Sequence, residues 1–285
     1  MVRSPNHVES AVGVDDLITD NEKIRTRNKR AARRQKAQRP KQGFFRTLIQ
    51  VLGELLITCG VILLLFVVWE LWWTNIEANS AQQAAVSQFA QDFQGPVTPP
   101  PADAPPVDYG DPKVMAAPDQ GSTVFGVVYI PRFGATYSRP LVEGTAPAQL
   151  DTLGLGRYDS AVMPGGVGNF AVAGHRQTHG AVLDAVHTLV PGDKIYVQTK
   201  DGYYTYVFRN NQIVMPNRAD VLAAVPTQPD ATPTDRFMTM TSCNPRFGAE
   251  ERIISYSLLE SWQPASAGPP AEIAAQVAAN QNGKG

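Results

Sequence analysis

An uninterrupted apolar run near the N-terminus limits what this chain can fold into. Residues 51–73 read VLGELLITCGVILLLFVVWELWW, and residues 55–69 within this run carry no charged side chain. At a rise of about 1.5 Å per residue, an α-helix of about 20 such residues spans the hydrocarbon core of a bilayer. We therefore expect residues 47–73 to form a single transmembrane helix that anchors the chain.

The charges beside this run predict its orientation. Residues 23–46 contain eleven Lys and Arg and no Asp or Glu, whereas the chain from residue 74 onward has 13 Lys and Arg against 19 Asp and Glu. Basic residues flank the cytoplasmic end of a transmembrane helix, and Trp side chains like those that end this run favour the interface. The sequence predicts a cytoplasmic, largely disordered tail over residues 1–46 and an extracellular remainder. A cleaved signal peptide is the alternative, but the apolar core and its leader are long for that class.

Composition divides the outer part into three segments. Residues 74–122 begin with an Ala- and Gln-rich stretch that could extend as a helix, and they continue into PVTPPPADAPPVDYGDP, which is typical of an extended spacer. Residues 263–285 are rich in Pro, Ala, Gly and Gln and are predicted to be disordered. Residues 123–262 between them are predicted to form one domain. The lack of a basic surplus here argues against nucleic-acid binding.

This domain is predicted to be mainly β, because it contains short apolar or alternating stretches bounded by turn residues. The predicted strands are 124–130, 138–142, 169–173, 194–199, 203–214, 236–242 and 252–259. A short helix is expected over residues 145–153, with Thr145 as its N-cap and Gly154 as its stop. Many short strands at this spacing suggest a barrel or a sandwich.

One cysteine of this domain is a candidate nucleophile. The chain has two cysteines, and Cys59 lies in the apolar run, so a disulfide to Cys243 is implausible on reach. Cys243 ends the predicted strand MTMTSC, His175 follows the strand FAVAG, and Arg252 opens a strand nine residues after Cys243. A nearby His or Arg favours a thiolate, and Arg can stabilise an oxyanion. These residues alone leave open a buried, unreactive Cys243 with structural His and Arg neighbours.

Two segments resemble the signature segments of the sortase family. They are AVAGHRQTHG, which contains His175, and MTMTSCNPRFGAEER, in which Thr239 to Cys243 resemble the family's TLTTC motif with Met for Leu and Ser for Thr. The GHR and THG elements, the stretch GDKIYV and the nine-residue gap to Arg252 are most similar to class E sortases of actinobacteria. The resemblance covers residues 124–259.

The resemblance implies a closed β-barrel of about eight strands with short helices, and a catalytic trio of His175, Cys243 and Arg252. It implies a cysteine transpeptidase that cleaves an LAxTG-like C-terminal sorting signal between Thr and Gly. The acyl group would pass from a Cys thioester to an amine of a lipid-linked cell-wall precursor. Tyr158 and Thr241 are expected to bind substrate. The implied partners are surface proteins bearing the signal, the precursor and the membrane, and no cofactor is expected. The sequence itself indicates no metal site, because no acidic cluster has the spacing of a calcium loop.

Two other interpretations stay open. The first is another cell-wall cysteine enzyme, an L,D-transpeptidase or an amidase of peptidoglycan, although the L,D-transpeptidase pattern has His and Gly immediately before the Cys, where this chain has Ser242. The second is a non-catalytic, membrane-anchored β-module. Reaction of Cys243 with a thiol probe would separate the second interpretation from the enzymes.

Overall fold

The computed structural model describes residues 25, 27, 29, 43–93, 95–101 and 107–283. The chain forms two compact units, Met1–Leu64 and Leu65–Gly285. Helix α2, Phe44–Asp92, begins in the first unit and ends in the second. Most of the predicted cytoplasmic tail lies outside the described residues.

Helix α2 carries the predicted anchor. Of the helices in the described ranges, it alone is long and apolar enough to cross a membrane, by length and composition. Its large apolar side chains from Phe44 to Trp69, and those of Trp72 and Trp73, are exposed in the structure, as expected for a surface that faces lipid rather than protein. The predicted segment, residues 47–73, therefore lies entirely within a continuous helix.

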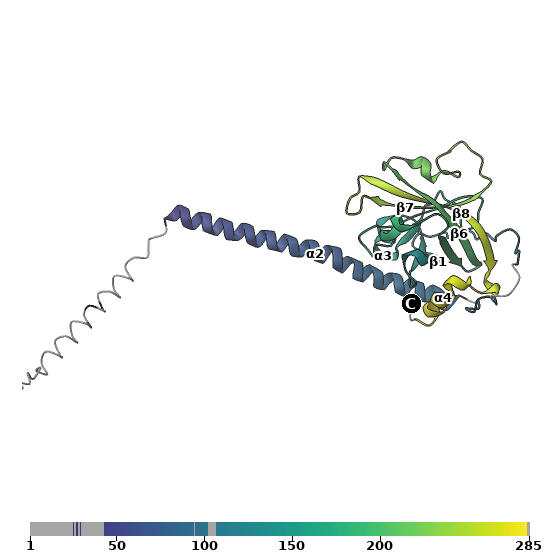
Figure 1. Ribbon diagram of the computed structural model, residues 1–285, viewed down its shortest axis with the longest axis horizontal. Helices are drawn as coiled ribbons and strands as arrows, with labels where there is room; N and C mark the ends of the chain where they lie inside the picture. The colour runs from purple at the N-terminus through teal and green to yellow at the C-terminus, as the bar shows by residue number, and fades with distance from the viewer. Residues whose placement is uncertain are drawn as a thin grey trace, which may run out of the picture. The chain divides into compact units, whose positions relative to one another are not determined.

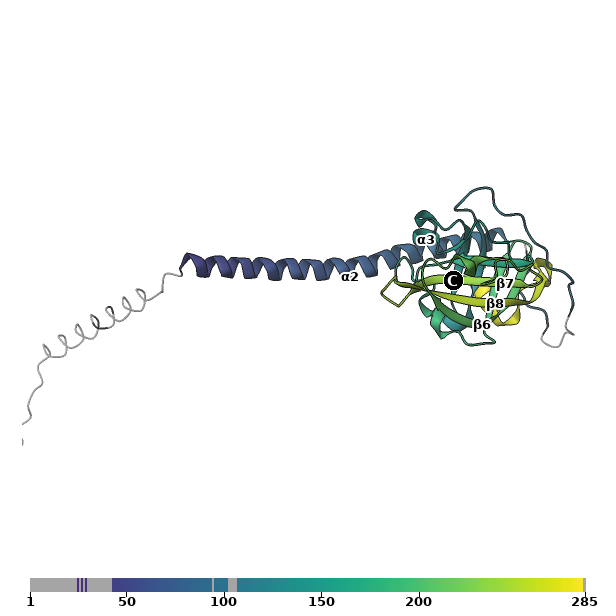
Figure 2. The same cartoon turned by 90° about the horizontal axis from the view of Figure 1, so that it is seen from above.

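Eight strands of the described residues form a closed barrel (Figure 1, Figure 2). They are β1 Val124–Tyr129, β2 Ser138–Glu143, β3 Leu155–Arg157, β4 Gly168–Ala173, β5 Lys194–Thr199, β6 Gly202–Val214, β7 Arg236–Asn244 and β8 Glu251–Pro264. The order around the barrel is β1-β2-β3-β4-β7-β8-β6-β5, and β5 closes it by pairing with β1. The pairs β2–β3 and β4–β7 are parallel and the others antiparallel. Closure leaves no free sheet edge.

The barrel confirms the predicted mainly β fold, and seven of its strands lie where the sequence predicts them. The prediction misses β3, which is only three residues long. The shorter helices of the described chain are η1 Pro131–Phe133, α3 Pro147–Leu153, η2 Asp184–Thr188, η3 Ala219–Leu222, η4 Ala265–Ala267, η5 Ala271–Ile273 and α4 Ala274–Gln281.

The predicted N-cap of α3 is wrong. Ala146, not Thr145, occupies the N-cap position, and it makes no side-chain hydrogen bond to the helix. Pro147 follows at the first helical position, where its ring fixes the backbone for a helix and its missing N–H needs no partner. This helix therefore begins at a proline and has no side-chain N-cap.

Alternating residues of the strands fill the barrel and cover its outside. On β1, Val128 belongs to the interior cluster, whereas Val127 and Tyr129 belong to a second cluster on the outer face. Tyr196 of β5 and Tyr203 of β6 join this outer cluster. Aromatic residues on the outer face of a barrel need cover, because exposure of so much apolar surface to water is unfavourable.

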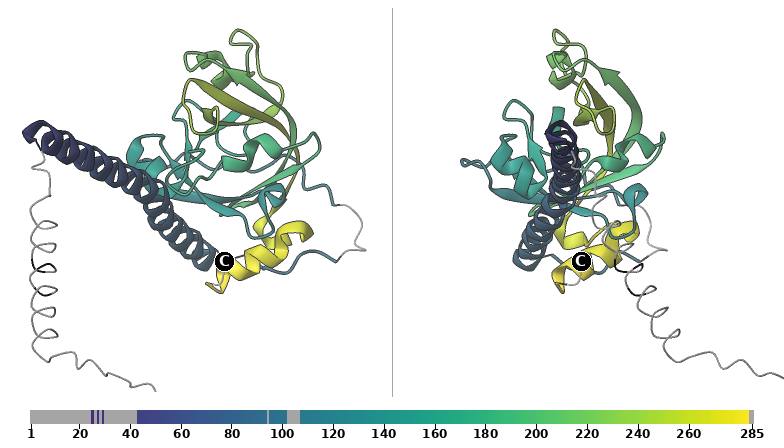
Figure 3. Two further views of the ribbon diagram at one scale, coloured as in Figure 1. Left: turned by 60° about the vertical axis from the view of Figure 1, so that its left-hand side comes forward. Right: turned by 90° about the vertical axis from the view of Figure 1, so that its left-hand side faces the viewer.

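The cover comes from the two segments that composition alone assigns to a spacer and a tail (Figure 3). Val86 of α2 and Phe93, the residue after its end, are buried in the outer cluster, together with Ile273 of η5 and Val277 of α4. The predicted disorder of residues 263–285 is therefore wrong for residues 263–283. Two apolar side chains one helical turn apart dock an otherwise Ala-rich helix, and overall composition does not reveal such a pair.

The predicted spacer, residues 74–122, also packs on the barrel where the structure describes it. Buried side chains on α2 recur every three or four residues and form one helical stripe. They are Ala78, Gln82, Val86 and Ala90, and the buried Phe93 follows directly after the helix. Further along, the Gly110 carbonyl accepts a hydrogen bond of 2.8 Å from the indole of Trp262, and the Lys113 carbonyl accepts one from the Tyr204 hydroxyl. The described part of this segment is therefore bonded to the barrel and is not a free spacer.

Candidate active site

Three neighbouring strands bring the predicted catalytic residues into one row. β4 and β7 run parallel with Ala173 opposite Thr241, so His175 falls level with Cys243 two residues further on. The pairing continues past the end of β4, because the Gly174 amide donates to the Thr241 carbonyl at 3.1 Å. On the other side of β7, Cys243 lies opposite Arg252 of β8.

Cys243 and Arg252 also share a face of the sheet. Val172 of β4, Met240 of β7 and Ile253 of β8 belong to the barrel interior. Side chains alternate between the two faces along a strand, so the odd-numbered positions of β4 and β7, and position 252 of β8, point outward. The fold therefore places Cys243 and Arg252 on the outside of the barrel, and His175 follows two residues after the end of β4. In the part of the chain that the structure describes, no hydrogen bond joins their side chains to one another.

Cys243 is a half-buried free thiol next to a buried arginine. Arg176 donates to the Cys243 carbonyl at 3.2 Å and also to the Asn244 side chain. Burial lowers the pKa of Arg176 from its ordinary value, and the carboxylate of Asp184 partly offsets this effect. Arg176 therefore places a positive charge beside the backbone of Cys243. No role is predicted for Arg176 from the sequence. It is the R of the GHR motif, and this motif is the sequence signal that could identify it.

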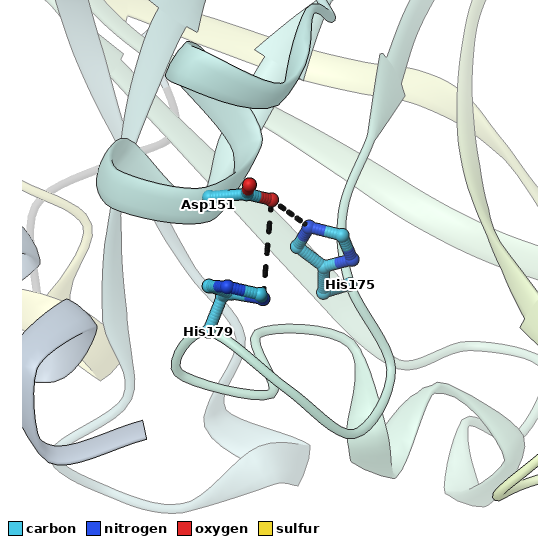
Figure 4. Close-up of side chains that lie close together, drawn as sticks. All are labelled: Asp151, His175 and His179. Carbon is cyan, nitrogen blue, oxygen red and sulfur yellow. Dashed lines mark hydrogen bonds and ion pairs between the residues drawn. The ribbon is translucent and has the colours of Figure 1, made fainter. Parts of the chain in front are cut away.

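His175 lies against an acidic residue that sequence analysis does not identify. Its Nε2 is 2.7 Å from Oδ1 of Asp151, which belongs to the last turn of α3 (Figure 4). The second histidine of the motif, His179, has its Nδ1 3.8 Å from the same oxygen, and the two rings lie 5.0 Å apart. Asp151 precedes His175 by 24 residues, and no motif marks it. Only the packing of α3 beside the end of β4 reveals this contact.

Arg252 is engaged with the loop that joins β7 to β8. Its Nη1 donates to the carbonyls of Ala249 and Glu251, at 2.9 and 2.8 Å. The guanidinium is half-buried and carries donors beyond this one nitrogen. It therefore lies level with Cys243 and retains donors for a further partner.

The two predicted substrate-binding residues are in direct contact. The hydroxyl oxygens of Tyr158 and Thr241 lie 2.8 Å apart, and either can be the donor. Behind Tyr158, Arg157 donates to its carbonyl at 3.1 Å and forms a two-pronged ion pair with buried Glu143. Thr241 lies two residues before Cys243 on the same face of β7. Tyr158 is thus held beside the row of predicted catalytic residues.

Helix α2 holds the loop that carries the two histidines. The Asn75 amide donates to the Gln177 carbonyl at 3.2 Å, and its oxygen accepts from the Gly180 amide at 2.8 Å. About two helical turns after Asn75, Gln82 donates to the His179 carbonyl at 3.0 Å. Gly180 has a φ of +88°, and a Cβ there would lie 2.7 Å from the Gln82 side chain. The helix and the loop are thus closely fitted.

A small cavity lies between this helix and the candidate site. Its volume is about 270 Å³. It is lined by Thr74, Glu77, Ala78, Ala81, Asp151, Thr152 and His179. Asp151 and His179 are therefore reachable from the side of the domain that meets α2.

Comparison with known proteins assigns the family. The model of the sortase domain matches residues 128–260. Sortase SrtE1 of Streptomyces coelicolor is 31% identical over 248 residues, which make up 85% of this chain and 65% of that protein. The SrtA sortase from Actinomyces oris matches with a TM-score of 0.55 and 33% identity, over 58% of this chain and 94% of that one. The chain belongs to the sortase family.

The class predicted from the motifs is confirmed as well. Sortase SrtE2 of Streptomyces coelicolor is 29% identical over 74% of this chain and 81% of its own length. Sortase E1 of the same organism, solved with a tripeptide in the active site, matches with a TM-score of 0.50 and 32% identity over 53% of this chain and 97% of that one. This sortase therefore resembles class E, which leaves the L,D-transpeptidase and amidase interpretations without support.

Proposed function

We propose that this sortase is a membrane-anchored cysteine transpeptidase that cuts a sorting signal and transfers the acyl part to an amine. The proposal is supported by the ends of β4, β7 and β8, where Cys243 lies opposite Arg252 and His175 follows two residues after the end of β4, which pairs with β7. A nucleophile, a proton carrier and a fixed cation side by side are the parts that acyl transfer requires.

In the first step, the Cys243 thiolate attacks the carbonyl carbon of the scissile amide. Arg252 donates hydrogen bonds to the resulting oxyanion, with donors that the carbonyls of Ala249 and Glu251 leave unused. Collapse of this intermediate breaks the C–N bond, and protonated His175 gives its proton to the leaving amine. The product of this step is a thioester on Cys243.

In the second step, the acceptor amine attacks the thioester carbonyl and gives its proton to His175. The thiolate leaves, and the new amide is released. Asp151 accepts from one ring nitrogen of His175 and fixes the plane of the imidazole, which leaves Nδ1 to exchange protons. We assign Asp151 as a positioning residue for this reason.

The substrate we propose is an LAxTG-like signal cut between Thr and Gly, and the acceptor is an amine of a lipid-linked cell-wall precursor. Tyr158 and Thr241 support this assignment, because their paired hydroxyls lie beside the row. A precursor anchored in lipid also suits a catalytic domain whose histidine loop is bonded to the helix that continues from the predicted membrane span. The catalytic domain is then extracellular and the N-terminus cytoplasmic.

The test is mass spectrometry of the full chain in detergent after incubation with a sorting-signal peptide. We expect an acyl adduct on Cys243 and its disappearance when an amine is added, with release of the transpeptidation product. The Cys243→Ala variant should form no adduct, whereas Cys59→Ala, which removes the other thiol, should form it normally. A non-catalytic module would give no adduct with any peptide, and an adduct that persisted in Cys243→Ala would refute the assigned nucleophile.

A further inference from the structure

Asp151, His175 and His179 place three potential metal ligands together. Their ligand atoms all lie within 4.8 Å of one another. The side chains are each about one third exposed, with values of 38%, 29% and 30%. These exposed fractions leave the cluster accessible to an ion from solvent, and Figure 4 shows the three side chains turned toward one another.

The donor set fits a transition-metal cation better than Ca²⁺ or Mg²⁺. Two imidazole nitrogens and one carboxylate oxygen are common Zn²⁺ ligands, whereas Ca²⁺ and Mg²⁺ prefer oxygen. Metal–ligand bonds of about 2.0–2.2 Å in a tetrahedral site separate neighbouring ligand atoms by roughly 3.3 Å. The observed separations from Asp151 Oδ1, 2.7 Å to His175 and 3.8 Å to His179, lie on either side of that value.

His179 has an unused ligand atom that faces the cluster. Its Nδ1 is buried and makes no hydrogen bond, and Asp151 Oδ1 is the nearby acceptor at 3.8 Å. The backbone at His179 has a φ of +51°, in the left-handed region. The surrounding loop is fixed by Asn75 and Gln82 of α2. A residue other than Gly is strained in that region, and a buried ring nitrogen without a hydrogen bond is costly. Both features indicate that His179 has a function beyond holding the loop together.

We propose that Asp151, His175 and His179 form a binding site for a divalent transition-metal cation, best matched by Zn²⁺, with water as the fourth ligand. Metal binding takes up His175 and removes it from proton transfer. The bound ion therefore inhibits the enzyme. The inhibition rests on the proposed function, but the binding of the ion is independent of it.

Cobalt tests the site directly, because Co²⁺ replaces Zn²⁺ and absorbs visible light. The full chain without an affinity tag, in detergent, is titrated with Co²⁺ and then with Zn²⁺. We expect one equivalent of a tetrahedral cobalt spectrum that Zn²⁺ displaces. His179→Ala and the isosteric Asp151→Asn should each weaken binding at least about tenfold. His187→Ala, a change at an exposed histidine outside the cluster, should leave it unchanged.

Three results would overturn the site. They are the absence of saturable cobalt binding, equal affinity in His179→Ala and the unaltered chain, or an intense thiolate-to-cobalt band that Cys243→Ala abolishes. Circular dichroism of each variant checks that the barrel is retained. Because the titration needs no substrate, it decides the metal site whether or not the chain transfers acyl groups. In the activity assay, Zn²⁺ should suppress the adduct on Cys243, and His179→Ala should need at least about tenfold more Zn²⁺ for the same effect.

Discussion

Strand register sets the position of Arg252, and hydrogen bonds to the preceding loop restrict its side chain. It lies opposite Cys243, and one of its nitrogens is bonded to the carbonyls of Ala249 and Glu251. These bonds restrict the guanidinium before substrate arrives, so less conformational freedom is lost when the oxyanion forms. Lys at this position would keep the charge but lose the planar array of donors.

Replacing Arg252 by Ala should therefore cost about 2–4 kcal/mol of transition-state stabilisation, because an oxyanion donor is lost. We expect kcat/KM for a sorting-signal peptide to fall on the order of a hundredfold to a thousandfold. Arg252→Lys should recover part of the loss. Alkylation of Cys243 by a thiol probe serves as the control for folding and access. Near-normal turnover in Arg252→Ala, with normal alkylation, would remove this residue from the mechanism.

The contact between Tyr158 and Thr241 is expected to determine which sorting signal the enzyme prefers. An Ala residue after the first Leu of the signal keeps a backbone N–H that Pro lacks. A Tyr hydroxyl can accept from that N–H, and its contact with Thr241 fixes where the oxygen lies. An acceptor left unpaired by Pro costs roughly 1–3 kcal/mol.

Peptides of the form Leu-Ala-x-Thr-Gly should therefore exceed Leu-Pro-x-Thr-Gly in kcat/KM by about tenfold to a hundredfold. Tyr158→Phe should narrow this ratio, and Thr241→Val should narrow it less, because it disturbs only the orientation of the hydroxyl. The ratio is measured by assaying the two peptides side by side with the unaltered chain and with each variant. Equal rates in the unaltered chain would contradict the assigned preference and leave the catalytic row unaffected.

At this scale, motifs predict His175, Cys243 and Arg252 because each stands at a strand end with a recognisable neighbourhood. Sequence alone does not predict Asp151. It lies on a helix far along the chain from Cys243 and enters the site only because α3 packs beside the end of β4. The catalytic roles of the three residues stay predictions.

At the scale of elements, α2 is both the predicted anchor and a support of the histidine loop. Asn75 makes two hydrogen bonds to the backbone of this loop, to Gln177 and Gly180. Each such bond contributes about 0.5–1.5 kcal/mol. The support comes from the first residues beyond the apolar run, so the position of the loop is set by the helix that carries the anchor.

Asn75→Ala should loosen the loop and lower kcat more than it raises KM, because the proton carrier moves while the substrate contacts remain. The loss of these two bonds should cost about 1–3 kcal/mol. Hydrogen exchange of the amides from Gln177 to Gly180 should accelerate in parallel. Gln83→Ala, on the exposed side of the same helix, is the matched control. Unchanged exchange in Asn75→Ala would show that the loop does not depend on this helix.

Helix α4 and η5 supply the second cover of the barrel. Ile273 is 3% exposed and packs in the outer cluster with Tyr129 and Tyr196. Ile273→Ala should lower the free energy of unfolding by about 2–5 kcal/mol, because it removes buried methyl groups and leaves a cavity. Ala271→Ser, at an exposed position of the same helix, should be nearly neutral. Urea unfolding followed by circular dichroism measures both, and equal midpoints would mean that the C-terminal segment is not docked.

The strands and the covers differ in how well sequence predicts them. A strand is marked by its own alternation and turn residues, so β5 is predicted to the residue. The covers are marked by only a few apolar side chains within Ala- and Gln-rich stretches, and those become informative only once the outer face of β1 is known to be aromatic. Local pattern predicts the barrel, whereas the cover depends on contacts over long sequence distances.

For the whole molecule, charge and hydropathy are separated along the chain. The full chain has a formal net charge of −1, but residues 23–46 contribute eleven positive charges and the part from residue 74 onward a net charge of −6. The apolar part of α2 lies between these regions. Basic residues resist transfer across a membrane during insertion, so we expect the basic side to stay in the cytoplasm.

We expect protease added to intact protoplasts to digest the sortase domain and to spare a tag on the N-terminus. The domain carries the acidic surplus and lies on the far side of the apolar helix, whereas the tag lies beside the eleven basic residues. A tag on the C-terminus should disappear with the domain, and lysis with detergent before digestion should remove both tags. As a matched variant, replacing the Lys and Arg of residues 23–46 by Gln should yield a fraction of molecules with the opposite pattern, since these charges set the orientation. Digestion of the N-terminal tag in intact protoplasts of the unaltered chain would contradict the orientation, and with it an extracellular site of transpeptidation.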